Sequence, residues 1–211
     1  MGESALQVNG RSVSTGRIYV PNEGVWFADL DLADADPLTG AASITLGPTT
    51  LKGTVDDGAS GLFGLRRRVR VIAGGAGWRK EIKPAGYRND AGVKASTVAS
   101  DAAKECGETL GTFAGGADRL GAHYLRNAGP ASQTIEDAAR GVPWWVAYDG
   151  ITHVSARTIT EPARPTFEEQ GISDELADRR PLFTFPGHAA DLLEVRIRDF
   201  NSNSHTSSVE K

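Results

Sequence analysis

Residues 131–154, ASQTIEDAARGVPWWVAYDGITHV, join one helical pattern to two strand patterns. Apolar residues recur at helical spacing in Ser132–Arg140, which predicts a helix with its serine as N-cap and Gly141 as its stop. The runs Trp144–Tyr148 and Ile151–Ser155 flank Asp149-Gly150. We expect a tight type I′ hairpin there, because both central residues tolerate positive φ. The predicted order is helix, strand, turn and strand.

A second helical pattern lies upstream, in Ser96–Thr109. We expect Ser96 or Thr97 to cap its start, because a hydroxyl can accept a free N–H of the first turn. Gly107 or Gly111 is expected to end it. The positions that share its apolar face are Val98, Ala102, Cys106 and Leu110. These small side chains predict a helix that packs closely on its neighbour.

Short strand patterns fill the first third of the chain. They are Leu6–Val8, Arg11–Val20, Val25–Leu32, Ser43–Leu46, Thr50–Val55 and Leu65–Ala73. Asn9-Gly10 predicts a type I′ turn between the first two. In Val25–Leu32, the even-numbered residues from Trp26 to Leu32 share one face, and Asp29 and Asp31 share the other. Strands at this spacing predict a small barrel or sandwich.

The fold class is therefore α+β and mostly β: small barrel or sandwich strands with a two-helix plus β-hairpin insertion. We expect a barrel-like domain over residues 1–90 and a helix and hairpin domain over 91–160. Residues 161–211 are interpreted as a connector, a C-terminal strand at Leu192–Arg198 and a flexible tail. A short helix is expected at Phe167–Ala177.

Composition limits the function classes. The chain has 211 residues and a net charge of −4, so it lacks the basic excess typical of nucleic-acid binding. One cysteine, Cys106, rules out an internal disulfide framework. No apolar run approaches the ~18 residues of a membrane span, and the start lacks the pattern of a signal peptide. We expect synthesis in the cytoplasm and no transmembrane segment.

Candidate catalytic and metal residues are weak. Cys106 lies on an apolar helix face, where a free cysteine is commonly a small buried hydrophobe. The four histidines are scattered and lack metal-ligand spacing. The aspartates at positions 29, 31, 34 and 36 allow a calcium site, but a solvated strand edge is favoured because the segment lacks the calcium-loop glycine and glutamate. No catalytic, metal or cofactor-binding residue is predicted.

Two further runs carry charge or glycine. Arg66, Arg68 and Arg70 share a strand face, which favours a basic solvent face or a salt-bridging surface between subunits over nucleic-acid binding. The run Gly74–Gly77 has the glycines of a phosphate loop. It lacks the lysine and the Ser/Thr of that motif.

Five residues are predicted to form a partner interface. Trp144 and Trp145 point to opposite faces of a strand, so one belongs to the core and Trp145 is assigned as an interface anchor. The proline-rich segment after residue 156 has little apolar periodicity yet contains large apolar side chains. We expect them to dock on a neighbouring subunit as an arm. They are Phe167, Leu182, Phe183 and Phe185.

Two segments, Val93–Leu110 and Ala131–Val154, resemble phage baseplate hub proteins of the late-control type. The first resembles the capped helix of small residues followed by glycine, and the second the helix, aromatic strand, Asp-Gly turn and closing strand. The resemblance spans about residues 5–160. It implies a non-enzymatic region that forms trimers and joins the tail tube to the central spike. The chain is short for a complete hub protein, and residues after 160 match no part of that pattern.

The expected function is therefore a structural component of a phage tail, at the baseplate hub or tail tip. We expect it in the virion tail as a trimer or sixfold ring, beside tube and baseplate or tip proteins. No specific nucleic-acid binding is expected, although the genome would pass through the lumen. One rival is a carbohydrate-binding or receptor-binding β-module, which would expose Trp26, Trp78 or Trp145 in one groove. The other is a cell-wall hydrolase with Glu105 and Glu108 paired on one helix face.

Overall fold

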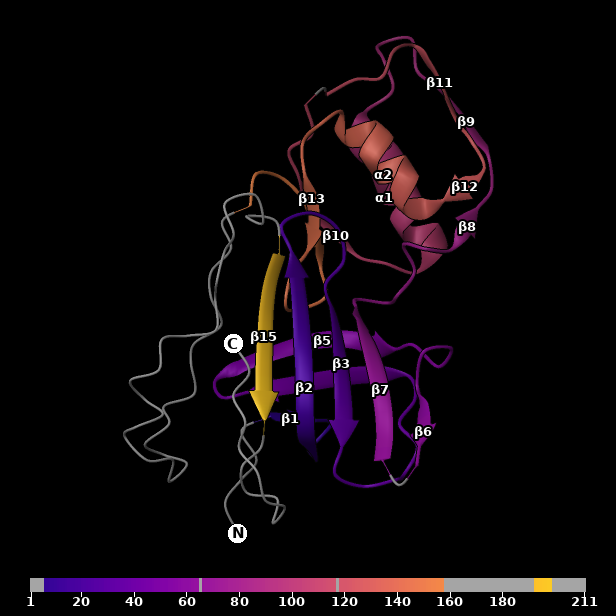
Figure 1. The fold of residues 1–211 in the computed structure, drawn as a ribbon. Helices are drawn as coiled ribbons and strands as arrows, with labels where there is room; N and C mark the ends of the chain where they lie inside the picture. The colour runs from indigo at the N-terminus through magenta and orange to yellow at the C-terminus, as the bar shows by residue number, and fades with distance from the viewer. Residues whose placement is uncertain (1–5, 65, 117, 158–191, 199–211) are drawn as a thin grey trace. The chain divides into compact units, whose positions relative to one another are not determined.

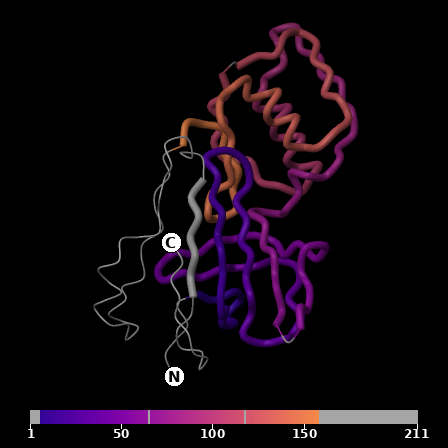
Figure 2. Tube along the Cα trace, viewed as in Figure 1, coloured from indigo at the N-terminus to yellow at the C-terminus, as the bar shows by residue number. Residues whose placement is uncertain are grey.

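The computed structural model describes residues 6–64, 66–116, 118–157 and 192–198 (Figures 1 and 2). Contacts group these residues into two units. The first contains residues 6–21 and 26–72 together with the last strand, and the second contains residues 22–25 and 73–157. Each unit is described by itself. The functional boundaries expected near residues 90 and 160 stay a prediction.

The first unit is a closed barrel. Its strands are β1 (Leu6–Val8), β2 (Arg11–Pro21), β3 (Phe27–Leu32), β4 (Ala41–Leu46), β5 (Thr49–Val55), β6 (Gly61–Phe63), β7 (Arg66–Ala73) and β15 (Leu192–Arg198). Six of them form the ring β1-β4-β5-β7-β3-β2, which the pairing of β1 with β2 closes. β6 pairs with β7, and β15 pairs with β2, outside this path. The predicted mostly β class is confirmed, with a barrel rather than a sandwich.

Alternation places the core of the barrel. Ala28 and Leu30 of β3 are fully buried, and Leu32 is 1% exposed, whereas Asp29 and Asp31 lie on the outer side. The predicted faces of this strand are confirmed. A slip of one residue against β7 would turn both aspartates into the core, so the hydrophobic pattern fixes the register.

Two backbone positions show why glycine is needed. Asn9 and Gly10 both have positive φ, at 49° and 75°, as the predicted tight turn between β1 and β2 requires. Gly53 lies where β5 meets β7, and a Cβ there would collide with the carbonyl oxygen of Ile72. A side chain at Gly53 would therefore open the barrel wall.

The second unit combines short strands with two helices. In order they are β8 (Glu81–Ile82), β9 (Ala85–Arg88), α1 (Ala95–Cys106), β10 (Leu110–Phe113), β11 (His123–Arg126), β12 (Gly129–Pro130), α2 (Ala131–Ala139), β13 (Trp144–Val146) and β14 (Thr152–Val154). β10, β14 and β13 form a sheet in which β10 runs parallel to β14. β9 pairs with β11, and β8 pairs with β12. Both helices predicted for this unit are present, and the short helix expected at Phe167–Ala177 lies outside the described residues.

The helices pack through small residues, but their predicted N-caps are wrong. Ala99, Ala102 and Ala138 are fully buried. Lys94 is the N-cap of α1 and Pro130 that of α2, and neither helix has a side-chain cap. Pro130 has φ −57° and ψ 138°, so it is the extended last residue of β12 and the chain turns helical directly after it. Gly107 ends α1 with φ 85°, as expected.

The hairpin after α2 differs from its prediction. Gly150 has φ 86°, but Asp149 is not among the residues with positive φ. Its carboxylate instead accepts the N–H of Ile151 at 2.9 Å. The turn closes through Gly150 N–H to the Ala147 oxygen at 3.0 Å, so it is longer than the two-residue turn expected, and β13 and β14 are correspondingly shorter.

Neither helix of the described part is long and apolar enough to span a membrane.

Candidate interaction surface

A ladder of ion pairs covers the outer side of β3 and β7. The Nε atoms of Arg70 and Arg68 lie 2.7 Å and 2.9 Å from carboxylate oxygens of Asp29 and Asp31. Val69 and Val71 point the other way and are fully buried. The predicted arginine face is thus real, but two of its cations pair within their own chain.

These pairs change the titration of the acids and bases. Partial burial acts to raise the pKa of Asp31, but hydrogen bonds from Arg68 and Thr15 outweigh it, and the pKa lies below 3.8. The hydrogen bond with Asp29 raises the pKa of Arg70. Asp31, Arg68 and Arg70 are therefore charged over the whole neutral range.

Aromatic rings lie among the arginines. The Arg70 guanidinium is 5.0 Å from the centre of the Phe27 ring, which stacks on Tyr19 at 4.6 Å. Arg68 is 5.6 Å from the centre of the Phe63 ring. Mixed arginine and aromatic side chains are enriched at protein interfaces.

The hairpin of β6 and β7 carries the exposed end of this surface. Leu62 is 55% exposed and Phe63 is 61% exposed. Arg66 is exposed, and its guanidinium has no hydrogen bond or salt bridge within the described residues, although its charge helps to lower the pKa of Asp31. We call Leu62, Phe63, Arg66 and Arg68 the hairpin patch. Large apolar side chains at this exposure, beside an unpaired cation, mark a candidate docking site.

Trp145 is half-buried, whereas Trp144 belongs to the core at 4% exposure. The Trp145 ring stacks on His153 at 4.8 Å and lies 4.8 Å from the Arg157 guanidinium. Its Nε1 is buried and finds no acceptor among the described residues. The other four predicted interface residues, Phe167, Leu182, Phe183 and Phe185, lie outside the described residues.

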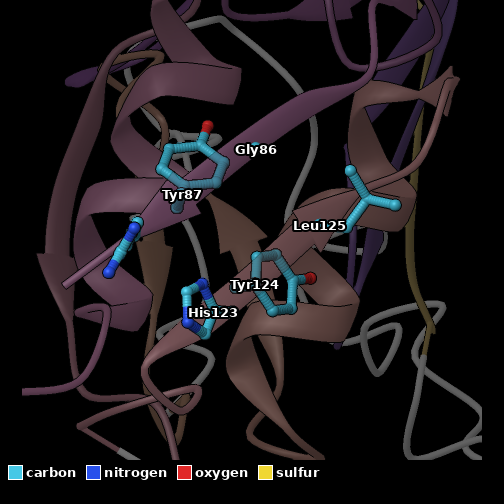
Figure 3. A pocket seen from close by; sticks show the side chains of 6 residues that line it. Gly86, Tyr87, His123, Tyr124 and Leu125 are labelled. Carbon is cyan, nitrogen blue, oxygen red and sulfur yellow. The ribbon is translucent and has the colours of Figure 1, made fainter. Parts of the chain in front are cut away.

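A shallow hollow of about 420 Å³ lies on the β9–β11 pair. Figure 3 shows Tyr87, His123, Tyr124 and Leu125 around it. Leu125 is 67% exposed, the highest value among the large apolar residues described. The hollow is too open to enclose a small ligand, so it fits a macromolecular surface better than a substrate.

Cys106 is buried as predicted, at 1% exposure. Burial, with a contribution from the nearby Glu108 carboxylate, raises the pKa of its thiol to about 11. The thiol donates to the Ala103 oxygen. At neutral pH almost no thiolate is present, so the residue is a poor nucleophile.

Glu105 and Glu108 do not form the pair on one helix face that a hydrolase reading requires. Helix α1 ends at Cys106, so Glu108 lies beyond it. Glu105 holds Arg126 and the N–H of Lys83. The interpretation of one shared face is therefore wrong, because the left-handed Gly107 turns the chain away.

Glu108 instead holds the glycine run 74–77. It accepts the N–H groups of Gly75 at 2.9 Å and Gly77 at 2.5 Å, so the loop donates to a carboxylate of its own chain. Burial raises the pKa of Glu108 above its ordinary value, although these two bonds oppose the shift. Sequence reasoning missed this contact, because no local pattern links residues so far apart.

The remaining candidates from the sequence are the aspartate cluster and the tryptophans. Asp34 pairs with Arg11, which holds the pKa of Asp34 below 3.8. No group of three or more metal-ligating side chains occurs in the part of the chain described. Trp26 and Trp78 are at most 1% exposed, so they do not form the groove that the carbohydrate-binding rival requires.

Comparisons of sequence find no relative. No protein-family model matches the chain, and no curated protein matches it. Comparison of folds does find matches, at 13–15% sequence identity. The 43 kDa tail protein of prophage MuSo2 from Shewanella oneidensis has a TM-score of 0.51 and covers 74% of this chain and 54% of its own.

Two further solved structures have a similar fold. The E. coli c3393 protein is described as a type VI secretion component with structural similarity to the T4 tail proteins gp27 and gp5. Its TM-score is 0.57, over 75% of this chain and 52% of that one. A tail protein from Neisseria meningitidis MC58 has a TM-score of 0.52, over 77% and 54%. The chain has the fold of phage tail proteins. It spans about half the length of these proteins.

Proposed function

We propose that the chain is a structural component of a phage tail, located at the baseplate hub or tail tip. It joins the tail tube to the distal spike or fibres as a trimer or sixfold ring. The observation that carries the proposal is the fold: a closed barrel and a helix-hairpin unit that tail proteins match over 74–77% of the chain. One of these matches is a type VI secretion component that is itself described as similar to the T4 tail proteins gp27 and gp5.

The use of reactive groups supports a structural role. The Cys106 thiol is buried with a high pKa, and the two glutamates of the rival hydrolase hold backbone N–H groups and Arg126. These groups therefore stabilise the second unit. A catalytic pair would instead need access to the substrate.

The proline-rich segment, residues 156–190, is proposed as a partner-binding arm, with Trp145 as an anchor. Trp145 supports this role because its ring is held in place by His153 and Arg157, and because its buried Nε1 lacks an acceptor in the described part. A carbonyl oxygen on a neighbouring subunit would satisfy that donor.

Tail assembly in the absence of the protein tests the proposal. A phage with a nonsense codon in this gene is grown on a suppressor host and then on a non-suppressor host, and the particles are imaged. We expect tubes without a distal spike, and restored tails with the suppressor. Complete tails with spikes in the absence of the protein would overturn the proposal.

A further inference from the structure

The hairpin patch includes exposed side chains on both faces of β6. Neighbouring residues of a strand point to opposite faces, yet Leu62 and Phe63 are both more than half exposed. Among the residues that the structure describes, β6 pairs with β7 alone, and its other edge has no partner strand there. Both faces and one edge of β6 are available to another chain.

The charge of the chain is unevenly distributed. Residues 158–191 contain three Lys or Arg and seven Asp or Glu, a net charge of −4 that equals the charge of the whole protein. The residues before and after this segment are each balanced. The acidic segment also holds Phe167, Leu182, Phe183 and Phe185.

This composition complements the hairpin patch. Arg66 offers a guanidinium with no partner among the described residues, which fits a carboxylate of the acidic segment. Phe63 and Leu62 offer apolar surface for phenylalanine rings, and aromatic pairs gain more than their area alone. Arg68, already paired with Asp31, keeps its guanidinium over the Phe63 ring.

We propose that the hairpin patch of one copy binds the acidic segment, residues 158–191, of a neighbouring copy. The inference rests on the proposed role in an assembled tail and names the contact between its subunits. Different surfaces meet on the two copies, so the contact is heterologous and repeats around a closed ring.

The length of the segment permits this contact. Fully extended, a chain of this length spans up to roughly 110 Å. It is tethered at both ends, so a loop reaches about half of that, roughly 55 Å. This exceeds the roughly 40 Å diameter expected of a globular unit of about 150 residues. A neighbouring copy therefore lies within reach.

Complementation between two variants of the full chain tests the proposal. One carries Leu62→Ser and Phe63→Ser, and the other Phe183→Ser and Phe185→Ser. We expect each alone to self-associate at least about tenfold more weakly than the parent in sedimentation equilibrium, since apolar anchors carry most of a contact. Mixed together, they should form a one-to-one dimer, because one intact patch and one intact segment remain.

Lys52→Ser is the control in the same barrel, since Lys52 is exposed on β5 and lies outside both the patch and the hollow. It should leave self-association unchanged, and thermal melting should show that every variant folds. Charge reversal adds a second arm: Arg66→Glu should weaken association, and Glu168→Lys with Glu169→Lys should restore it.

Three results would overturn the proposal: a parent chain that stays monomeric, single variants that associate like the parent, or a mixture that forms no dimer. The last result is expected if each segment covers its own patch. These outcomes concern the subunit contact alone, and a tail assembled without the protein remains the separate test of the proposed function.

Discussion

Inside the barrel the buried side chains are mainly branched aliphatics, such as Leu30, Ile44 and Leu51, whereas the two helices of the second unit meet through alanines such as Ala102 and Ala138. Branched side chains can be exchanged for others of similar volume at modest cost. A close approach fixed by alanine or glycine admits no larger side chain. The barrel therefore depends mainly on a pattern, with Gly53 as the exception, whereas the helical unit depends on individual small residues.

The two units also place their charges differently. The barrel pairs Asp29 and Asp31 with arginines on its outer side, whereas the helical unit buries Glu108 against a glycine run. Exposed pairs contribute little, because water already solvates the separate ions. A buried carboxylate couples stability to pH. We therefore expect substitutions to change the stability of the two units by different amounts, and pH to change it in opposite directions.

Gly77→Ala should have the largest effect. A methyl group there would collide with the carbonyl oxygen of Cys106, and a backbone atom cannot move cheaply. We expect the second unit to lose about 3 kcal/mol of unfolding free energy. Gly86→Ala, in the same unit, meets open space and should change stability by less than about 0.5 kcal/mol. Urea unfolding followed by tryptophan fluorescence compares them, and equal effects would show that the close approach is not required.

The pH dependence of the helical unit comes next. Burial raises the folded pKa of Glu108 above 4.5, so the folded state binds more protons between 4.5 and that higher value. Stability of this unit should fall as pH rises through this window, by at most about 1.4 kcal/mol per pH unit. Glu108→Gln should remove that slope. Amide hydrogen exchange at Gly75 and Gly77, corrected for the intrinsic pH dependence of exchange, measures this change of stability with pH.

The barrel should show the opposite trend in acid. The folded pKa of Asp31 and of Asp34 lies below 3.8, so their contribution is complete above 3.8 and is lost as pH falls through the folded values. Asp31→Asn is the matched control. Titration of the barrel below pH 3.8 and of the helical unit above pH 4.5 would sharpen the comparison, and slopes of the same sign in these two windows would contradict it.

Cys106→Ala should cost about 1 kcal/mol, because it removes one buried atom from the helix interface. Assembly should be unaffected once the chain is folded. In the native protein the thiol should react with a thiol reagent far more slowly than in urea, because it is buried and protonated. Fast native labelling together with loss of assembly would overturn its structural role.

The smallest effect is expected for the ladder. A double-mutant cycle of Asp31→Ala and Arg68→Ala should give a coupling of about 0.5 kcal/mol, since the Arg68 side chain is 53% exposed. High salt should reduce it further. A coupling above about 2 kcal/mol would show that the outer side of the barrel contributes more than the comparison allows.

Much of the barrel could be predicted from local patterns. Alternation along Val25–Leu32 identified both faces of β3, and Asn9-Gly10 identified the turn between β1 and β2. A strand period of two and a positive φ can both be recognised from neighbouring residues. The helical unit was harder. The strands β8 to β12 are too short to show a period, and the parallel pairing of β10 with β14 joins residues about forty apart.

The candidate surface was only partly predictable. The arginine face followed from alternation, but its aspartate partners depend on the register between β3 and β7. Phe63 and Leu62 were not singled out, since exposure of a short strand has no signature in sequence. The signal available was Gly64, which has φ 64° and turns the chain between β6 and β7. The contact of Glu108 with Gly77 required the folded structure.

A reconstruction of the assembled tail tests the central claim most directly. The account predicts three or six copies of the barrel and the helical unit around the tube axis at its distal end, with each copy touching its neighbours. Absence of the chain from the particle, or a single copy that touches no other, would contradict it.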